Sequence, residues 1–218
     1  MKTFFFESIY NTQEYALREL SSEPILVISY SQEKGKGTSN RIWLNADQAL
    51  ACSLAVKQED IKLEQTLIPL LAGYLFTEVL KDINLSLKWP NDIVLNNLKV
   101  GGILVEKYEN NICIGMGINY FWAKPEIPGA GSVFNKKQED SLLNLHAEKW
   151  AVEVLSSLAK NNFDLSKYKQ KLQTLGKIVE YPEGRGWAED INNDGSLKIK
   201  STDGDYINLT SPLISEVN

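Results

Sequence analysis

The sequence predicts an α+β protein, in which a mixed, mostly antiparallel sheet with helices is followed by a small five-stranded β-barrel. Segments rich in β-branched residues are interspersed with two long segments of helical apolar spacing, at 66–82 and 141–160. From residue 176 onward the pattern changes to short alternating strands separated by hairpin turns. We therefore expect a main domain over residues 1–175 and a small second domain over residues 176–218.

The first third of the chain contains three expected strands and two expected helices. Asn11 is a good N-cap for a helix that runs to Leu20, and Glu14 follows three residues later as in a capping box. Pro69 falls in the first turn of the helix at 66–82, where its missing N–H does little harm. The strands are expected at residues 3–6, 24–30 and 49–56.

Residues 88–106, KWPNDIVLNNLKVGGILVE, are the most unusual stretch of the sequence. Pro90 biases the preceding residue toward extended backbone, so Lys88 is expected at the end of a strand. Asn96 and Asn97 both tolerate positive φ and predict a tight hairpin turn. An ordinary hairpin is the alternative, but it leaves the polar residues before the turn unexplained.

Glycines mark three places where something is expected to approach the backbone closely. Gly101-Gly102 lies in the second strand of that hairpin, and the segment at 112–120, ICIGMGINY, carries a Gly-x-Gly-x-Asn pattern ending at Asn119. In residues 31–43, glycines alternate with lysines, which is typical of a loop that wraps an anion. Most basic flexible loops are only solvated, and this one lacks the GK[ST] pattern of a P-loop.

The last third of the chain is expected to contain two helices and the barrel. The helices are predicted at residues 141–160 and 165–175, and His146 in the first of them has no partner at metal-ligand spacing. The barrel is too small to bury much core alone, so it should pack on the main domain. Its strands are expected at residues 177–181, 186–191, 196–200, 206–210 and 212–217.

Composition excludes several classes of function. The 218 residues carry a net charge of −5 and are 43% hydrophobic, so nothing in the overall charge favours nucleic acid, and no stretch resembles a signal peptide or membrane span. Cys52 and Cys113 lie far apart with no CxxC spacing, which predicts neither a zinc site nor a disulfide framework. We expect a cytoplasmic protein without a structural metal, and the sequence leaves open whether it is a monomer or a homodimer.

Three motifs in order resemble those of biotin–protein ligases. Residues 88–92 are the KWPND motif of that family, residues 102–106 are its GILVE segment, and residues 115–119 are its GxGxN strand. Residues 32–43 align without a gap with the family's biotin-binding loop, and residues 10–13 align with its DST[NQ] segment. The resemblance covers nearly the whole chain from residue 4. Because no winged-helix segment precedes it, the chain is similar to the monofunctional type, without a DNA-binding domain.

The loop departs from the family pattern, which usually reads GRGRxGR, whereas this chain has GKGTSNR. Lys36 and Arg41 keep cations, Thr38 replaces an arginine and Asn40 replaces a glycine. In the earlier segment Asn11 replaces a serine. The family's SPxG after the tryptophan reads differently at residues 45–48. These changes are expected to affect substrate retention or loop ordering.

The resemblance implies an α+β catalytic domain with an SH3-like C-terminal barrel and a two-step reaction. Biotin and ATP, with Mg²⁺, would give biotinyl-5′-AMP, and a lysine of a biotin carboxyl carrier protein would then accept biotin. Lys88, Lys36 and Arg41 are the candidate catalytic cations, with Lys88 bridging the carboxylate and the α-phosphate. The candidate biotin-binding residues are Asn11, Thr12, Gln13, Gln32, Lys36, Gly37, Thr38 and Lys88. The candidate nucleotide-binding residues are Lys36, Arg41, Trp43 and Asn119.

Three alternatives stay open at the level of the sequence. One is a lipoate or octanoate ligase or transferase, another is a non-catalytic biotin or nucleotide sensor, and a third is a carrier-interaction module with a vestigial site. No metal ligands are identified, and the general base for the acceptor lysine is not apparent. Asp92 is a candidate base, but a role in orienting Lys88 or the hairpin is equally consistent with its position.

Overall fold

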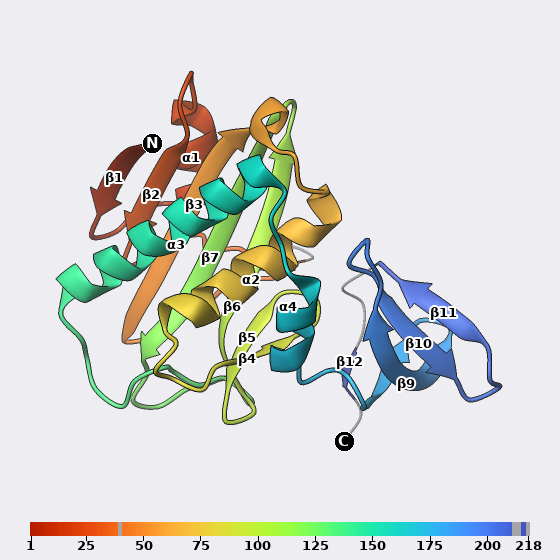
Figure 1. Ribbon diagram of the computed structural model, residues 1–218. Coiled ribbons are helices and arrows are strands. Elements are labelled where there is room, and N and C mark those ends of the chain that lie inside the picture. Colours follow the sequence, from red (N-terminus) through yellow and green to blue (C-terminus); the bar gives the residue numbers. More distant parts are fainter. Residues whose placement is uncertain (39–40, 211–214, 217–218) are drawn as a thin grey trace.

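The computed structural model describes residues 1–38, 41–210 and 215–216, and its strands form two sheets (Figure 1). The larger sheet has seven strands in the order β1-β2-β3-β7-β6-β5-β4. Strands β1 and β2 pair in parallel, and the other neighbouring strands of this sheet pair antiparallel. The strands are β1 Lys2–Phe6, β2 Ile25–Ser29, β3 Gln48–Lys57, β4 Ser86–Lys88, β5 Asp92–Leu95, β6 Leu98–Tyr108 and β7 Asn111–Phe121.

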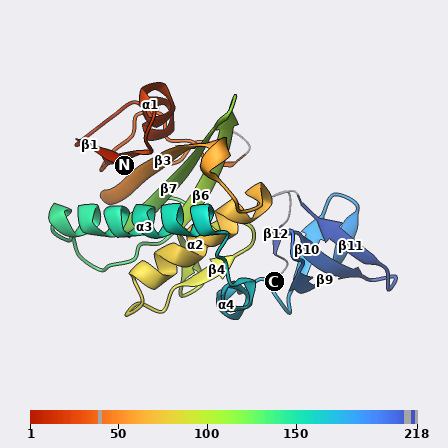
Figure 2. The ribbon, with the colours of Figure 1, turned by 45° about the horizontal axis from the view of Figure 1, so that its top comes forward.

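Helices cover both faces of this sheet. Two long helices, α2 and α3, lie side by side across one face, and the short helix α1 packs on the other (Figure 2). No helix in the described ranges is long and apolar enough to cross a membrane. The helices are α1 Thr12–Glu19, α2 Ile68–Val79, α3 Asp140–Lys160 and α4 Leu165–Lys171, with short 3₁₀ turns at Gln58–Asp60 and Gln65–Leu67.

The alternation of side chains along β2 explains why it is apolar throughout. Leu26 and Ile28 belong to the core beneath α2 and α3, whereas Ile25 and Val27 pack with Ala16 of α1. Successive side chains of a strand point to opposite faces, so a strand covered on both faces needs apolar residues at every position. All four of these side chains are buried.

The C-terminal part of the chain forms the second sheet, with strand order β11-β10-β9-β8-β12 and antiparallel pairing throughout. Its buried side chains belong to the same apolar core cluster as those of the main sheet, and the indole N–H of Trp89 donates to Gly195 O at 2.9 Å. The expected packing of this small unit on the main one is confirmed. Its strands are β8 Ile178–Tyr181, β9 Gly184–Ile191, β10 Leu197–Ser201, β11 Tyr206–Leu209 and β12 Ser215–Glu216.

The predicted fold class is confirmed, and the predicted elements differ from the observed ones mainly at their ends. The helix expected at 165–175 ends at Lys171, because the backbone then turns and Gln173 N donates to Leu87 O at 2.7 Å. The strand expected at 212–217 lies outside the described residues except for 215–216. The division into domains at residue 175 stays a prediction.

Two local predictions have different outcomes. The hairpin turn is confirmed, with φ of 50° at Asn96 and 64° at Asn97. The capping box is half right: Asn11 Oδ1 accepts from the backbone N–H groups of Gln13 and Glu14, as expected of an N-cap. The Glu14 carboxylate does not complete the box, because it is paired with Lys36 instead.

Candidate active site

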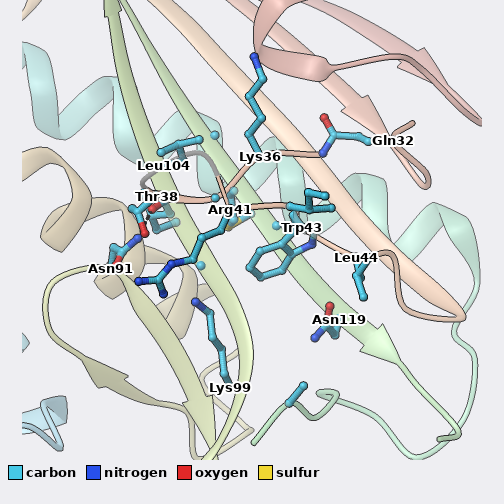
Figure 3. Close-up of a pocket in the computed structure, with 18 of the residues that line it drawn as sticks. Gln32, Lys36, Thr38, Arg41, Trp43, Leu44, Asn91, Lys99, Leu104 and Asn119 are labelled. Carbon is cyan, nitrogen blue, oxygen red and sulfur yellow. Dashed lines mark hydrogen bonds between the residues drawn. The ribbon is translucent and has the colours of Figure 1, made fainter. Parts of the chain in front are cut away.

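A cavity of about 290 Å³ lies between the main sheet, the first turn of α1 and two loops, whose described residues are 32–38 with 41–44 and 122–130 (Figure 3). Strands β3, β6 and β7 supply its floor. It therefore lies on the same face of the sheet as α1, in the part of that face that the helix leaves uncovered. Most of the motifs noted in the sequence meet there.

The floor is made of glycines because two side chains rest directly on the backbone. A Cβ atom on Gly115 would lie 2.7 Å from Gln13 Oε1, and one on Gly117 would lie 2.9 Å from Trp43 Cε2. Gly102, which pairs with Gly117, lies beneath the same indole ring, with 3.4 Å from its added Cβ to Trp43 Cζ3. The close approach predicted from the Gly-Gly and Gly-x-Gly patterns is confirmed.

A cluster of polar groups lies at one end of the cavity. Gln32 Oε1 accepts from both Thr12 N, at 2.8 Å, and Thr12 Oγ1, at 2.9 Å. Ser53 Oγ in turn donates to Thr12 Oγ1 at 2.8 Å. These three side chains offer fixed donors and acceptors in a mostly buried setting, which is what a small polar ring of a ligand requires. Sequence reasoning missed Ser53, because a serine within an apolar strand carries no motif.

The glycine- and lysine-rich loop folds as a small hairpin over this floor. Trp43 N donates to Gly35 O at 2.9 Å, and Gly37 N donates to Arg41 O at 2.8 Å. A Cβ on Gly35 would lie 3.0 Å from Trp43 O, so this position has no room for a side chain. The hairpin thereby places Trp43 over the floor and Arg41 on the cavity wall.

Asn11, one of the predicted biotin-binding residues, does not line the cavity. Its Oδ1 atom caps α1, and its Nδ2 group donates to Lys34 O at 2.8 Å. The side chain is 4% exposed. Asn11 therefore links the loop at Lys34 to the N-terminus of α1. Backbone groups already occupy both its Oδ1 atom and its Nδ2 group.

Three cationic side chains are found among the described residues that line the cavity: Lys36, Arg41 and Lys99. Arg41 and Lys99 point to the same part of it (Figure 3), whereas the Lys36 side chain extends away from them. Lys36 Nζ lies 2.8 Å from Glu14 Oε1, and this hydrogen bond raises the pKa of Lys36. Of these three cations, therefore, Arg41 and Lys99 are directed at the centre of the cavity.

Lys88 is the second predicted residue that does not line the cavity. Lys88 pairs with Asp92, Asp92 with Gly102, and Gly102 with Gly117, in one row across four strands. The Lys88 backbone thus lies two strand spacings, about 10 Å, from Gly102 at the cavity floor. Lys88 is absent from the described residues that line the cavity. Direct partners on adjacent strands share a face of the sheet, so Lys88 lies on the same face as the cavity floor, and its role between two substrates stays a prediction.

Lys99 lies over the cavity floor, beside the ring of Trp43. Its Cε atom lies 3.6 Å from where a Cβ on Gly102 would be, and its Nζ atom lies 5.5 Å from the centroid of the Trp43 ring. Nζ also lies 2.5 Å from Asp92 Oδ1. Sequence reasoning missed this residue, because a lysine after an Asn-Asn turn looks like an ordinary turn residue. Its place three residues before Gly102 is the signal that could have identified it.

The second loop, residues 122–130, was also missed, and it is bonded to the backbone of Lys99. Lys99 N donates to Gly129 O at 2.8 Å, and Gly131 N donates to Lys99 O at 2.9 Å. In the sequence this stretch indicates only a Pro/Gly loop. Its apolar side chains also line the cavity; they include Trp122, Ile127 and Pro128.

Asn119 joins the second loop to the floor and has one unused polar atom. Its Nδ2 group donates to Gly131 O at 2.9 Å. Its Oδ1 atom is buried and has no hydrogen-bond partner within the described part of the chain. A buried carbonyl oxygen without a partner is costly, so this atom is poised to accept a hydrogen bond from a ligand.

Neither a metal cluster nor a reactive thiol is evident in the part of the cavity that the structure describes. Within residues 1–38, 41–210 and 215–216, no three His, Cys, Asp or Glu side chains are grouped so as to hold a metal ion. Cys52 and Cys113 are both buried free cysteines, and burial raises the pKa of each thiol, which keeps it protonated.

Nine of the predicted site residues line the cavity, whereas Asn11 and Lys88 do not. The roles given to these nine stay predictions, because no ligand is present to test them. The nine are Thr12, Gln13, Gln32, Lys36, Gly37, Thr38, Arg41, Trp43 and Asn119.

The chain matches a known ligase family in sequence and known structures in fold. Residues 5–119 match the Biotin/lipoate A/B protein ligase family, and the chain belongs to that family. Two structures of the biotin protein ligase from Aquifex aeolicus align with nearly the whole chain. The complex with biotin and ATP has a TM-score of 0.83 at 24% identity, covering 99% of this chain and 98% of that one. A point mutant of the same ligase in complex with biotin has a TM-score of 0.82 at 26% identity, covering 100% and 98%.

Curated relatives in sequence are also biotin ligases. Biotin–protein ligase 1 of Arabidopsis thaliana is 30% identical over 124 residues, which are 50% of this chain and 34% of that protein. The biotin–[acetyl-CoA-carboxylase] ligase of Mycobacterium tuberculosis is 26% identical over 191 residues, covering 79% of this chain and 72% of that protein. The chain thus spans about a third of the length of the plant relative.

Proposed function

We propose that this protein is an ATP-dependent ligase, which activates biotin as biotinyl-5′-AMP and transfers it to a lysine of a biotin carboxyl carrier protein. The observation that carries the proposal is the placement of Lys99. It lies over the cavity floor, beside Trp43 and Arg41, between the polar cluster of Thr12 and the unpartnered oxygen of Asn119.

The order of groups along β7 matches the order of groups in biotinyl-5′-AMP. Gly115 pairs with Ser53 of the polar cluster, Gly117 lies under the Trp43 ring in the row of Asp92, and Asn119 follows two residues later. At about 3.4 Å per residue, the three rows span about 14 Å. We assign the ureido ring to the first row, the carboxyl and α-phosphate groups to the second and the adenine base to the third.

In the first step, a carboxylate oxygen of biotin attacks the α-phosphorus of ATP. A carboxyl O–P bond forms, the bond from the α-phosphorus to the bridging oxygen breaks, and pyrophosphate leaves. Both reactants are anionic, so the main task of the protein is to offset their repulsion and hold them in line. Lys99 and Arg41 supply two cations at the reacting groups, and Lys36 supplies a third once it leaves Glu14.

In the second step, the amine of the carrier lysine attacks the acyl carbon of the adenylate. A C–N bond forms, the C–O bond to AMP breaks with its electron pair going to AMP, and the amine releases a proton. Asn119 Oδ1 is suited to accept from the exocyclic amine of adenine and so to hold the nucleotide during both steps. The family resemblance implies Mg²⁺ with ATP, and it would offset part of the phosphate charge.

The polar cluster favours biotin over lipoate or octanoate. The ureido ring of biotin has N–H donors and a carbonyl acceptor that match Thr12, Gln32 and Ser53, whereas a dithiolane ring or an alkyl end has nothing to pair with them.

The buried free cysteines, which form no disulfide, are consistent with the reducing cytoplasm as the proposed compartment.

The test is to incubate the protein with ATP, Mg²⁺ and an isolated carrier domain of a biotin-dependent carboxylase, supplying biotin, lipoate or octanoate separately. We expect the carrier to gain the mass of one biotin and no mass with the other two acids. Modification by lipoate or octanoate would support the lipoyl alternative, and biotin binding without modification would support the non-catalytic one.

A further inference from the structure

A second cavity, of about 220 Å³, lies where the main unit meets the C-terminal sheet. Four residues line both cavities, so the second adjoins the first: Thr38, Asn91, Ile103 and Leu104. Its other walls come from the first turn of α2, the Trp89-Pro90 pair and the turn between β9 and β10. Nothing in the proposed activation of biotin uses this space.

Hydrogen bonds and close packing hold the walls of the second cavity in place. The backbone N–H of Trp89 donates to Thr174 Oγ1 at 2.9 Å, and its indole N–H donates to Gly195 O at 2.9 Å. Gly195 has a φ of +84°, and an added Cβ would lie 3.2 Å from Thr66 O. The β9–β10 turn is therefore fitted tightly against the start of α2, and the cavity between them is a built feature of the fold.

The lining combines an apolar wall, several uncharged polar residues and one negative charge. Pro69, Leu70, Trp89 and Pro90 form the apolar wall, and Asp194 is the one ionisable residue among the described residues that line the cavity. Both hydrogen bonds that Asp194 accepts within its turn, from Ser196 N at 2.9 Å and from Ser196 Oγ at 2.6 Å, use Oδ1. These bonds lower the pKa of Asp194, so the carboxylate is charged at neutral pH and its Oδ2 atom takes no part in the turn.

A cavity of this kind does not suit pyrophosphate or the phosphates of ATP. A polyphosphate needs cations or several N–H donors directed at it, whereas this lining carries a carboxylate and no lysine or arginine in its described part. It suits a lysine side chain, which has a four-carbon apolar stem and a cationic end.

We propose that the second cavity admits the acceptor lysine of the carrier protein, with Asp194 drawing its ammonium group in and the Trp89–Leu70 wall packing its stem. This inference rests on the proposed ligase function and adds the route by which the second substrate reaches the adenylate. The lysine enters from the side of the C-terminal sheet and reaches the first cavity past Thr38 and Asn91. It loses its proton to solvent before the amine attacks the acyl carbon and AMP leaves.

The two half-reactions can be measured separately, and that separation tests the inference. Biotin-dependent exchange between ATP and pyrophosphate reports the first step. Single-turnover transfer from preformed biotinyl-5′-AMP to the carrier domain reports the second.

Three variants alter the second cavity. Asp194→Asn keeps an acceptor for Ser196, Asp194→Lys reverses the charge, and Thr66→Trp fills the cavity from an exposed position. Asp203→Asn, in the exposed β10–β11 turn outside both cavities, is the matched control.

We expect all four variants to keep normal exchange and normal reaction of the adenylate with hydroxylamine, a nucleophile too small to need the cavity. Transfer to the carrier should fall about fivefold in Asp194→Asn and more in Asp194→Lys, with weaker dependence on salt, as for removal of a steering charge. Thr66→Trp should block transfer, and Asp203→Asn should match the wild type.

The outcomes distinguish failure of this inference from failure of the proposed function. Normal exchange with unchanged transfer in Asp194→Lys and Thr66→Trp would overturn the route alone. A lower KM for ATP in Asp194→Lys would also overturn it, because the cavity would then hold phosphate. Absence of biotin-dependent exchange in the wild type would overturn the ligase function and the route with it.

Discussion

The ammonium group of Lys99 lies 2.5 Å from Asp92 Oδ1, and this ion pair lies beside the indole ring of Trp43 on the glycine floor of the cavity. The two side chains come from neighbouring strands that the Asn96-Asn97 hairpin joins. Asp92 therefore fixes the direction of Lys99 and is positioned to orient it. The aspartate of the KWPND motif thus orients a lysine on the next strand, and the ion pair links the two strands of the hairpin.

Asp92→Asn should lower the rate of adenylate formation about tenfold without unfolding the protein. The amide still accepts a hydrogen bond from Lys99 but no longer holds it by charge, so the ammonium group is less well placed for the reacting oxygens. The measurement is biotin-dependent pyrophosphate exchange, with the melting temperature as the control for folding. An orienting role predicts partial recovery in Asp92→Glu, whereas unchanged exchange in Asp92→Asn would refute it.

Glu14→Gln should raise the affinity for biotin by releasing Lys36 from its ion pair. Both side chains are about half exposed, so the pair contributes little to stability, of the order of 0.2–1 kcal/mol. We expect a lower KM for biotin and an unchanged melting temperature. Glu19→Gln, on the same helix beside Arg18, is the matched control. An unchanged or higher KM for biotin in Glu14→Gln would show that the ion pair does not compete with the ligand.

Gly117→Ala should weaken nucleotide binding more than it weakens the fold. The new methyl group would lie 2.9 Å from Trp43 Cε2, so the ring must move off the floor. We expect the KM for ATP to rise by about three- to tenfold, since the ring is partly exposed and can shift. Gly73→Ala in α2 is the control, because its methyl group would meet neighbours at 3.4 Å or more and helices favour alanine. Equal behaviour of the two variants in ATP binding would contradict the role of Trp43.

The single histidine should make the protein less stable in mild acid. His146 Nδ1 lies 2.8 Å from Tyr120 Oη, and burial, with Lys149 nearby, lowers the pKa of His146 below its usual value of about 6.5. As the pH falls through the usual histidine pKa, the unfolded chain binds a proton at His146 that the folded chain does not bind. The free energy of unfolding should therefore fall as the pH drops from about 7.5 to about 5.5.

The measurement is urea unfolding at several pH values, for the wild type and for His146→Gln. The variant should lose most of the slope between about pH 7.5 and 5.5, because no other histidine titrates there. A slope of equal size in both proteins would mean that other groups cause the loss of stability.

The fold was predictable from the sequence because its signals are local. The Asn96-Asn97 turn, the Asn11 cap and the apolar run of β2 each act through their own backbone, and all three are where the sequence indicates. The end of α4 was not predictable, because it depends on a bond to Leu87, which is distant in the chain.

The candidate site was only partly predictable, because its roles depend on which side chains meet across strands. Lys88 stands in the recognisable motif, whereas Lys99, which no motif marks, is brought over the floor by the register of the sheet. The sequence places Lys36 in the cavity, yet its pairing with Glu14 depends on how the loop meets α1. Ser53 and Trp122 carry no motif, and only the folded chain brings them to the cavity.

The central claim is that Lys99, and not Lys88, provides the cation at the reacting groups. The most direct test is biotin-dependent exchange between ATP and pyrophosphate in Lys99→Gln and Lys88→Gln, each checked for an unchanged melting temperature. We expect exchange to fall about 100-fold or more in Lys99→Gln, as when one group that stabilises a transition state is removed. Lys88→Gln should lose less exchange than Lys99→Gln, because Lys88 is absent from the described residues that line the cavity. Near-normal exchange in Lys99→Gln, or its loss in Lys88→Gln alone, would contradict the claim.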